Sequence, residues 1–192
     1  AAAVARGGSR RADLLGAVLA LRAGDDDAAR SKITRIEASA GESAQAWALE
    51  WLCSPPLASL HVGDQRDIGY IAGFSRPEDD AGGNFRWLGE RGRIVLPLPE
   101  PLAADATVAL RISGGRPGVT PLDARIGDGP VWRLPVEGGQ WRVYRLPIPP
   151  ALVGQSQLAI QLHAPPFVPA FADPSSQDLR VLSVRVSDVR VE

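Results

Sequence analysis

Apolar residues follow two different rhythms along this chain, and the change comes near residue 55. Before it, they recur at the i, i+1, i+4 and i+5 positions of an amphipathic helix, as in Leu14, Leu15, Val18 and Leu19. Gly24 is a candidate helix stop. Asp25 to Asp27 can then cap a second helix through Ile36, because acidic residues stabilise the positive end of a helix. Residues 1–54 are therefore predicted to form a helical segment.

A third short helix is predicted from Ser43, where Trp47 and Trp51 are i, i+4 neighbours on one face. We expect this face to dock on the rest of the protein, and contact with a partner chain is the alternative. The helical segment is compatible with an isolated helical hairpin and with the end of a helical repeat array.

Beyond Ser54, Pro55 and Pro56 break the helical pattern, and short apolar runs recur between frequent Pro and Gly residues. Several runs alternate apolar and polar residues, as a half-buried strand does. The runs that predict strands are residues 93–98, 107–113, 124–126, 131–136, 141–148, 157–164 and 179–191. This spacing predicts a mainly β domain over residues 55–192, an antiparallel β-sandwich or jelly roll preceded by the small helical segment.

Composition narrows the function classes only a little. The chain is 45% apolar and 22% charged with a net charge of −1, so no global field attracts nucleic acid. Cys53 is the only cysteine, which excludes an internal disulfide and a cysteine-based zinc site. The longest apolar stretch near the start, residues 14–21, is too short to span a bilayer. Because Met is absent, we expect the chain to be processed, trimmed or part of something longer.

No standard catalytic arrangement is visible in the sequence. His61 and His163 are far apart, and each is interpreted as a strand or loop residue. Cys53 and His61 lack a third orienting group, so Cys53 is interpreted as a buried structural thiol. Phosphate-loop and nucleophile-elbow motifs are missing as well. The chain is therefore predicted not to be an enzyme.

Carboxylates are the remaining candidate chemistry, and they cluster in an acidic loop, Glu78 to Asp80, with Asp64 and Asp67 upstream. Glycoside hydrolysis needs two facing carboxylates, which clustering on one loop does not provide. The same oxygens are candidates for a structural Ca²⁺, which takes 6–8 oxygen ligands. The candidate calcium ligands are Asp64, Asp67, Glu78 and Asp80. A solvated acidic loop is the simplest interpretation, and no other cofactor is expected.

Aromatic and arginine residues add the last candidates. Phe85 and Trp87 are two apart and share one side of a strand, with Arg86 opposite, and Trp87 is expected to face the core. Trp132, Trp141 and Tyr144 are candidates for a sugar-stacking platform or for the core. Arg86 and Arg116 follow Gly-rich turns and suit carboxylates, so Asp67–Arg86 or Asp178–Arg116 pairs that pin loops are expected. The candidate ligand-binding residues are Asp67, Glu78, Asp79, Asp80, Arg86, Trp87 and Arg116.

At these residues the chain resembles a known family over residues 60–192. It is similar to the extracytoplasmic β-sandwich domain of green non-sulfur bacterial membrane glycosyltransferase-like proteins of the dolichyl-phosphate-mannose mannosyltransferase type. The matching positions are Gly63-Asp64, Gly73-Phe74, Glu78, Arg86-Trp87, Gly114-Gly115-Arg116-Pro117, Phe167-Val168-Pro169 and Asp178-Leu179-Arg180. The chain departs from the pattern at two places. The family has Thr where this chain has Leu88, and the family has Leu-Gly where this chain has Val181-Leu182.

The resemblance implies an accessory jelly roll on the outer face of a membrane, without the multi-span catalytic portion. We therefore expect a non-catalytic, galactose-binding-like module for recognition or assembly in a larger membrane-associated protein. Its expected partners are other protein chains, the membrane-embedded part of the same protein, or a glycan. A structural subunit of a multi-protein membrane complex is the alternative, and a carbohydrate-active enzyme that uses the acidic loop is a second alternative.

Overall fold

A computed structural model describes residues 12–13, 15–20, 22–25, 27–33, 48, 55–64 and 66–192. The described strands are β1 (Ser59–His61), β2 (Ile71–Asp80), β3 (Gly83–Pro97), β4 (Thr107–Gly114), β5 (Val119–Ile126), β6 (Val131–Glu137), β7 (Arg142–Pro147), β8 (Gln157–His163) and β9 (Val184–Val191). A 3₁₀ turn, η1 (Pro150–Leu152), precedes β8, and a short helix, α4 (Pro169–Ala172), lies between β8 and β9.

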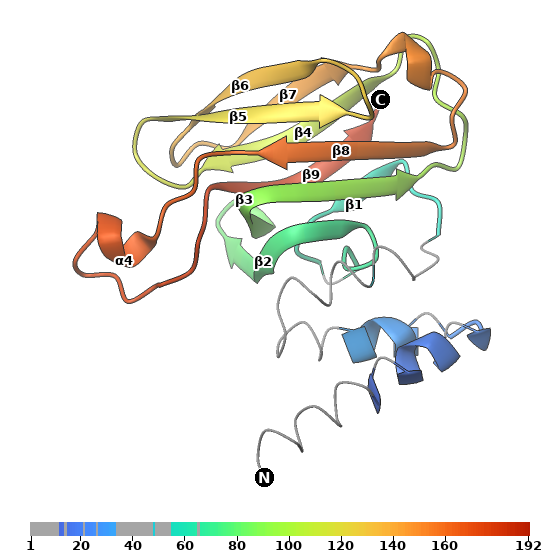
Figure 1. Cartoon of the computed structure of the whole chain (residues 1–192), viewed down its shortest axis with the longest axis horizontal. Helices are drawn as coiled ribbons and strands as arrows, with labels where there is room; N and C mark the ends of the chain where they lie inside the picture. Colours follow the sequence, from blue (N-terminus) through green and yellow to red (C-terminus); the bar gives the residue numbers. More distant parts are fainter. Residues whose placement is uncertain are drawn as a thin grey trace.

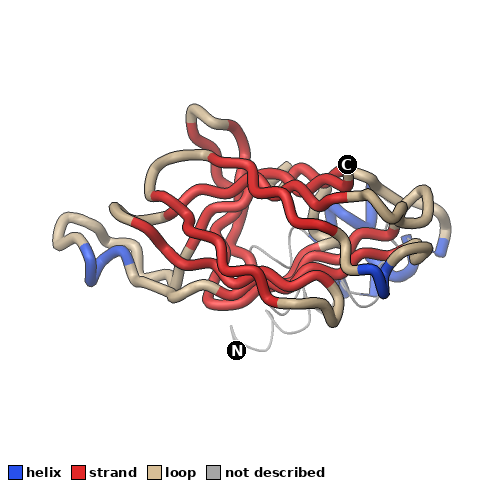
Figure 2. The backbone as a smooth tube through the Cα atoms, turned by 90° about the horizontal axis from the view of Figure 1, so that it is seen from above, coloured by secondary structure: helices blue, strands red, loops and turns tan. Residues whose placement is uncertain are grey.

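The strands form two layers, shown in Figure 1 and edge-on in Figure 2. The front layer contains β6, β5, β8, β3 and β2, and the back layer contains β7, β4, β9 and β1. All paired strands run antiparallel. The long strand β3 joins the layers, because Arg86 and Trp87 pair with β9 whereas Arg91 to Pro97 pair with β8. The predicted mainly β fold, an antiparallel sandwich, is confirmed.

Alternating apolar residues fill the space between the layers. In β8, Leu158, Ile160 and Leu162 are buried, while the polar residues Gln157, Gln161 and His163 on the other side are exposed. Strands β4 and β9 contribute a matching inner row from the opposite layer, which includes Leu110 and Val186. Burying both inner faces stabilises the sandwich at roughly 25 cal/mol per Å² of apolar surface removed from water.

Every strand predicted from the sequence overlaps a strand of the structure, whereas β1 and β2 were not among the predicted strands. Two further details differ. Residues 78–80, predicted as an acidic loop, are the end of β2. They pair with the start of β3 through a two-residue hairpin turn, in which Asp80 lies opposite Gly83 and the Asp80 carboxylate accepts a hydrogen bond from the Gly82 amide (2.7 Å). Strand β9 starts at Val184 rather than near residue 179, because the preceding residues belong to an excursion that carries α4.

The described part of the helical segment follows the predicted pattern. Residues 15–20 and 27–33 are helical, and Gly24 between them has a φ of 75°. The Asp25 carboxylate accepts a hydrogen bond from the Ala28 amide (2.9 Å), which is the N-terminal cap expected from the acidic run. The predicted start of a third helix at Ser43 and the Trp47–Trp51 face lie outside the described residues. Among the described helices, none has the length and apolar character needed to cross a membrane.

Candidate functional site

Asp67 and Arg86 form an ion pair that is completely enclosed beneath the β2–β3 hairpin. Both side chains are 0% exposed. The Asp67 carboxylate accepts hydrogen bonds from Arg86 Nε (2.6 Å), Arg86 Nη2 (2.9 Å) and the Gly63 amide (2.6 Å). Arg86 Nη1 also donates to the Ser75 carbonyl (2.9 Å). The pair therefore ties the loop before β2 to strands β2 and β3.

This geometry confirms the expected Asp67–Arg86 pair and corrects the idea that these residues bind a ligand. A side chain without exposed surface cannot touch a molecule in solvent. The carboxylate of Asp67 also accepts three hydrogen bonds from protein donors, one of them from the Gly63 backbone amide. The pair is a structural element of the sandwich.

Phe85 and Trp87 share one side of β3, as predicted, with Arg86 on the other. Their rings meet edge to face with centroids 6.0 Å apart. Trp87 is only half-buried and lies outside the main core, which corrects the expectation that it faces the core. The reason is the alternation of the strand: because Arg86 occupies the inner side, both aromatic neighbours lie on the outer side.

An aromatic–arginine cluster forms around these two rings on the back layer. Arg185 of β9 lies over three aromatic rings, with its guanidinium carbon 5.4 Å from the centroid of Phe85, 5.7 Å from Trp87 and 5.0 Å from Trp141. Arg111 of β4 lies 4.6 Å from the centroid of Trp141. Such stacked contacts stabilise the outer surface of a sheet through cation–π attraction. Trp141 belongs to this cluster, whereas Trp132 and Tyr144 pack against the core, so the three do not form a common platform.

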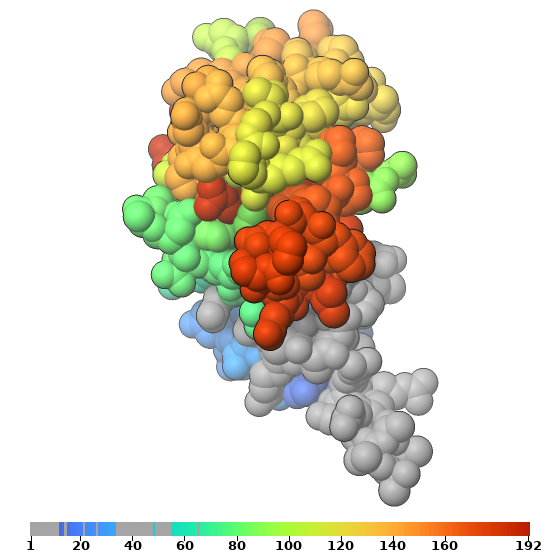
Figure 3. All heavy atoms as spheres, turned by 90° about the vertical axis from the view of Figure 1, so that its left-hand side faces the viewer, coloured from blue at the N-terminus to red at the C-terminus, as the bar shows by residue number. Residues whose placement is uncertain are grey.

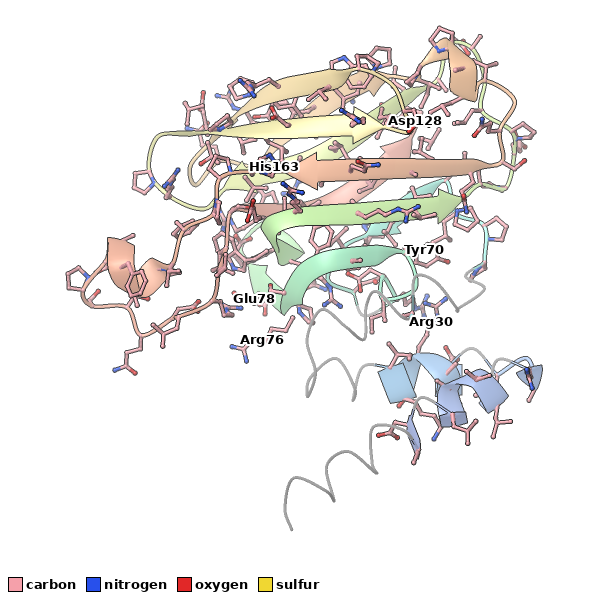
Figure 4. All side chains as sticks on the ribbon, in the orientation of Figure 1. Arg30, Tyr70, Arg76, Glu78, Asp128 and His163 are labelled. Atoms are coloured by element: carbon pink, nitrogen blue, oxygen red, sulfur yellow. The ribbon has the colours of Figure 1, made fainter. Side chains whose placement is uncertain are left out.

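The acidic residues at the end of β2 are engaged by arginines. Glu78 accepts hydrogen bonds from Arg180 Nη1 and from the Trp87 indole (3.2 Å). Asp80 accepts one from Arg185 Nη1 (2.7 Å). Figure 4 shows Glu78 at the hairpin, near the excursion that carries α4. Three of the predicted candidates, Glu78, Asp80 and Trp87, therefore lie together. The two carboxylates are paired with arginines rather than free.

Each of the four candidate calcium ligands has a partner within the protein. Asp67 is enclosed with Arg86, Glu78 pairs with Arg180, and Asp80 pairs with Arg185. Asp64 accepts a hydrogen bond from the Arg66 amide (2.8 Å). Among the described residues there is no group of three or more His, Cys, Asp or Glu side chains placed to hold a metal ion.

The Asp178–Arg116 pair predicted from the sequence is wrong. Asp178 instead pairs with Arg180, two residues away, with Nη2 2.6 Å from the carboxylate. Arg116 is exposed on the β4–β5 turn, with its guanidinium carbon 5.9 Å from the centroid of Phe167. Arg180 is held beside Asp178 by the local backbone, because the Arg180 amide also donates to the Asp178 carboxylate (3.0 Å), as in an Asx turn.

Because Asp178 pairs with Arg180, the free energy of unfolding should depend on pH in the acidic range. The hydrogen bonds from Arg180 hold the pKa of Asp178 below its usual value of 3.8. A carboxyl group with a lowered folded-state pKa stabilises the fold above its unfolded pKa, and this contribution disappears as the pH falls through the folded-state value. We expect Asp178→Asn to lower the free energy of unfolding at pH 6, and the difference from the unmodified protein to shrink below pH 3.8. Urea unfolding from pH 6 to pH 2 measures this, and a pH-independent difference would contradict it.

A separate feature, which the sequence reasoning missed, lies on the outer surface of the front layer. A groove of about 580 Å³ crosses this surface. We call it the front groove; its lining residues are Ala72, Gly73, Arg91, Gly92, Arg93, Asp123, Ala124, Arg125, Val131, Gln161, Leu162 and His163. They come from β2, β3, β5, β6 and β8. Figure 4 shows His163 at the end of β8, on the layer that lies in front.

Strand register places the polar side chains of the front groove in two parallel rows. In the first row, His163 of β8 lies between Asp123 of β5 and Arg91 of β3. In the second row, Gln161 lies between Arg125 and Arg93. Neighbouring strands are about 4.8 Å apart, so each row spans roughly 10 Å from β5 to β3. The rows bring hydrogen-bonding groups from three strands onto one surface.

The charges of the front groove are unevenly matched. Asp123 is held by Arg133 of β6 through two hydrogen bonds (2.8 and 3.1 Å), which lower the pKa of this carboxyl group. Arg93 and Arg125 are exposed, and no acidic side chain pairs with them among the described residues. Within the part of the chain that the structure describes, the one acidic contact of Arg91 is a long one with Glu90 (3.9 Å). The surface therefore presents guanidinium hydrogen-bond donors that acidic side chains of the described residues do not occupy.

The comparisons with known proteins concern the arrangement of strands. No family model matches the chain, and no curated protein matches it. A family 35 carbohydrate-binding module from Clostridium thermocellum is similar at 11% identity and a TM-score of 0.44, over 70% of this chain and 98% of the module. The carbohydrate-binding module CBM36, in complex with calcium and xylotriose, is similar at 12% identity and a TM-score of 0.40, over 71% of this chain and 100% of the module.

Two larger proteins contain a similar domain. An exo-β-1,3-galactanase from Phanerochaete chrysosporium is similar at 14% identity and a TM-score of 0.45, over 70% of this chain. A family two carbohydrate esterase from Cellvibrio japonicus is similar at 11% identity and a TM-score of 0.40, over 68% of this chain. The similarity spans only 29% of the galactanase and 32% of the esterase.

Proposed function

We propose that this chain is a non-catalytic binding module that holds an oligosaccharide in the front groove. The observation that carries the proposal is the double row of polar side chains across β5, β8 and β3, with Gln161 and His163 at its centre. A sugar chain presents hydroxyl groups that both donate and accept hydrogen bonds along its length. Arginine, glutamine and histidine side chains on adjacent strands supply complementary donors and acceptors.

The shape of the front groove also suits an extended ligand. It reaches from Val131 on β6 to Ala72 on β2, a distance of roughly 19 Å across five strands. Its position on a sheet surface leaves room for a chain longer than the groove. Asp123 is the one carboxylate among the described lining residues, and Arg133 holds it, so the pair of carboxylates used in glycoside hydrolysis is not assembled in this part of the protein.

Replacing Gln161 with Ala should weaken oligosaccharide binding by about tenfold, since one hydrogen-bonding side chain at the centre of a site contributes on the order of 1.4 kcal/mol. Isothermal titration with a panel of soluble oligosaccharides measures this effect. Gln157 provides a matched control, because it is exposed on the same strand and lies outside the front groove. Gln157→Ala should bind like the unmodified protein.

Two results would count against the proposal. One is the absence of binding by any oligosaccharide at millimolar concentration. The other is equal binding by Gln161→Ala and the unmodified protein, which would place the ligand elsewhere. Loss of binding on replacement of Glu78 or Arg116 would then favour the hairpin end of the sandwich, where the sequence first predicted a site.

A second candidate function is assembly with another protein chain, and one observation favours it. The excursion between β8 and β9 carries apolar side chains that are strongly exposed: Phe171 (84%), Leu179 (70%) and Val181 (54%). Figure 1 shows this segment, which carries α4, extending away from the strands, and in Figure 3 it faces the viewer in orange-red. Backbone hydrogen bonds hold its base, with the Phe167 amide 2.7 Å from the Leu182 carbonyl. Exposed apolar side chains on a loop whose base is fixed by hydrogen bonds are typical of protein–protein contact sites.

Self-association is the form of assembly that can be measured directly. Sedimentation velocity at increasing concentration should reveal dimers that Phe171→Ser abolishes, while Ser176→Ala on the same excursion leaves them unchanged. A monomer at all concentrations would remove this candidate.

The extracytoplasmic, membrane-associated setting implied by the family resemblance is part of the proposal. Recovery of the native protein in a cytosolic fraction would contradict it.

A further inference from the structure

The front groove carries an excess of positive charge that its own residues do not neutralise. Three arginines line it, Arg91, Arg93 and Arg125, against the single carboxylate of Asp123. That carboxylate is already paired with Arg133, which lies beyond the groove lining. The remaining guanidinium groups are exposed, so a ligand can reach them without disturbing the core.

The second row of the front groove has the spacing of a two-armed anion site. Arg93 and Arg125 flank Gln161 on the two neighbouring strands, so their backbones are roughly 10 Å apart. Both side chains are long enough to converge over Gln161, whose amide can donate a further hydrogen bond. An anion placed there would accept charge-assisted hydrogen bonds from both sides.

The lining also indicates how affinity would arise. No Trp, Tyr or Phe side chain lines the front groove among the described residues, so stacking on a sugar ring is not available there. A neutral glycan would depend on neutral hydrogen bonds in competition with water, and each of these contributes less net free energy than a hydrogen bond to a charged group. Planar, forked guanidinium groups match a carboxylate in shape and charge.

We propose that the ligand of the front groove is a carboxylate-bearing glycan, with a sugar carboxylate held between Arg93 and Arg125 above Gln161. This inference rests on the proposed function and specifies its ligand class. It assigns the arginines of β3 and β5 the role of selecting charge, and leaves the remaining polar side chains to contact hydroxyl groups.

A matched pair of ligands tests the inference: oligogalacturonate and the same oligomer with its carboxyl groups methyl-esterified. We expect the acid to bind at least about tenfold more tightly than the ester at low ionic strength. The preference should decrease as salt is added, since exposed charge interactions are screened. Arg93→Gln and Arg125→Gln should remove most of the preference. Arg145→Gln, a matched charge change on the back layer, should leave it intact.

The outcomes separate this inference from the proposed function. Equal binding of acid and ester would overturn charge selection while the groove still binds glycan. Equal or tighter binding of a sulfated dextran would overturn the carboxylate class in favour of general anion binding. No binding of any of these glycans would overturn the proposed function itself. Thermal unfolding of each variant, expected to match that of the unmodified protein, confirms that a loss of binding reflects the site.

Discussion

Replacing Asp67 with Ala is expected to lower the free energy of unfolding by about 3–5 kcal/mol. The substitution leaves the Arg86 guanidinium in an enclosed site without the carboxylate that neutralises it. It also removes the acceptor of the Gly63 amide. A buried charge without its counter-ion is among the most destabilising changes a point mutation can make. Urea unfolding of the variant at neutral pH measures the loss.

Two further variants make this prediction specific. The double variant Asp67→Ala with Arg86→Met should be less destabilised than the sum of the two single variants, because removing both charges removes the uncompensated one. Glu192→Ala, which breaks the exposed pair with Arg145, should cost only about 0–1 kcal/mol. A loss below about 1 kcal/mol for Asp67→Ala would refute the structural role given to the pair.

Gly73→Ala should also destabilise the sandwich, by at least about 2 kcal/mol. Gly73 has a φ of 82°, where a side chain costs about 1–2 kcal/mol. A Cβ atom there would also lie 2.1 Å from the Arg91 carbonyl oxygen, so the backbone of β2 or β3 must move. Because Gly73 lines the front groove, oligosaccharide binding should weaken together with stability. Thermal unfolding and titration of the same variant measure both effects.

Gly154 offers a matched control for this effect. It has the same φ of 82°, but a Cβ atom there would meet nothing within 4 Å. Gly154→Ala therefore reports the backbone cost alone, about 1–2 kcal/mol. The excess loss in Gly73→Ala measures the close approach of β2 to β3. If the two variants were equally destabilised, that close approach would have no energetic consequence.

The layered fold could be predicted because apolar and polar residues alternate within individual strands. In β8, the sequence places Leu158, Ile160 and Leu162 on one side, and all three are buried. Strand β2 was missed because it does not alternate: register shifts on both sides of Phe74 interrupt its pairing with β3. A pattern of period two cannot follow a strand across such irregularities.

The candidate site was harder to predict for a different physical reason. The Asp67–Arg86 pair could be expected because arginine forks suit carboxylates, but the same argument favoured Asp178–Arg116, and Asp178 pairs with Arg180 instead. The front groove could not, because Arg93, Arg125 and Gln161 come from three strands that only the register β3–β8–β5 brings side by side. One signal was present in the sequence: the exposed positions of these strands carry charged or amide side chains two residues apart. Strand order, which the sequence does not encode locally, was needed to combine them.

We propose that the front groove, rather than the hairpin end of the sandwich, holds the ligand. NMR chemical-shift mapping tests it most directly, with the tighter-binding member of the oligogalacturonate pair titrated into isotope-labelled protein. A ligand in the front groove should produce the largest shifts at the amides of residues 91–93, 123–125 and 161–163, with little change at residues 78–80 and at Arg116. Shifts concentrated at Glu78, Asp80, Trp87 and Arg116, with the front groove unchanged, would contradict it.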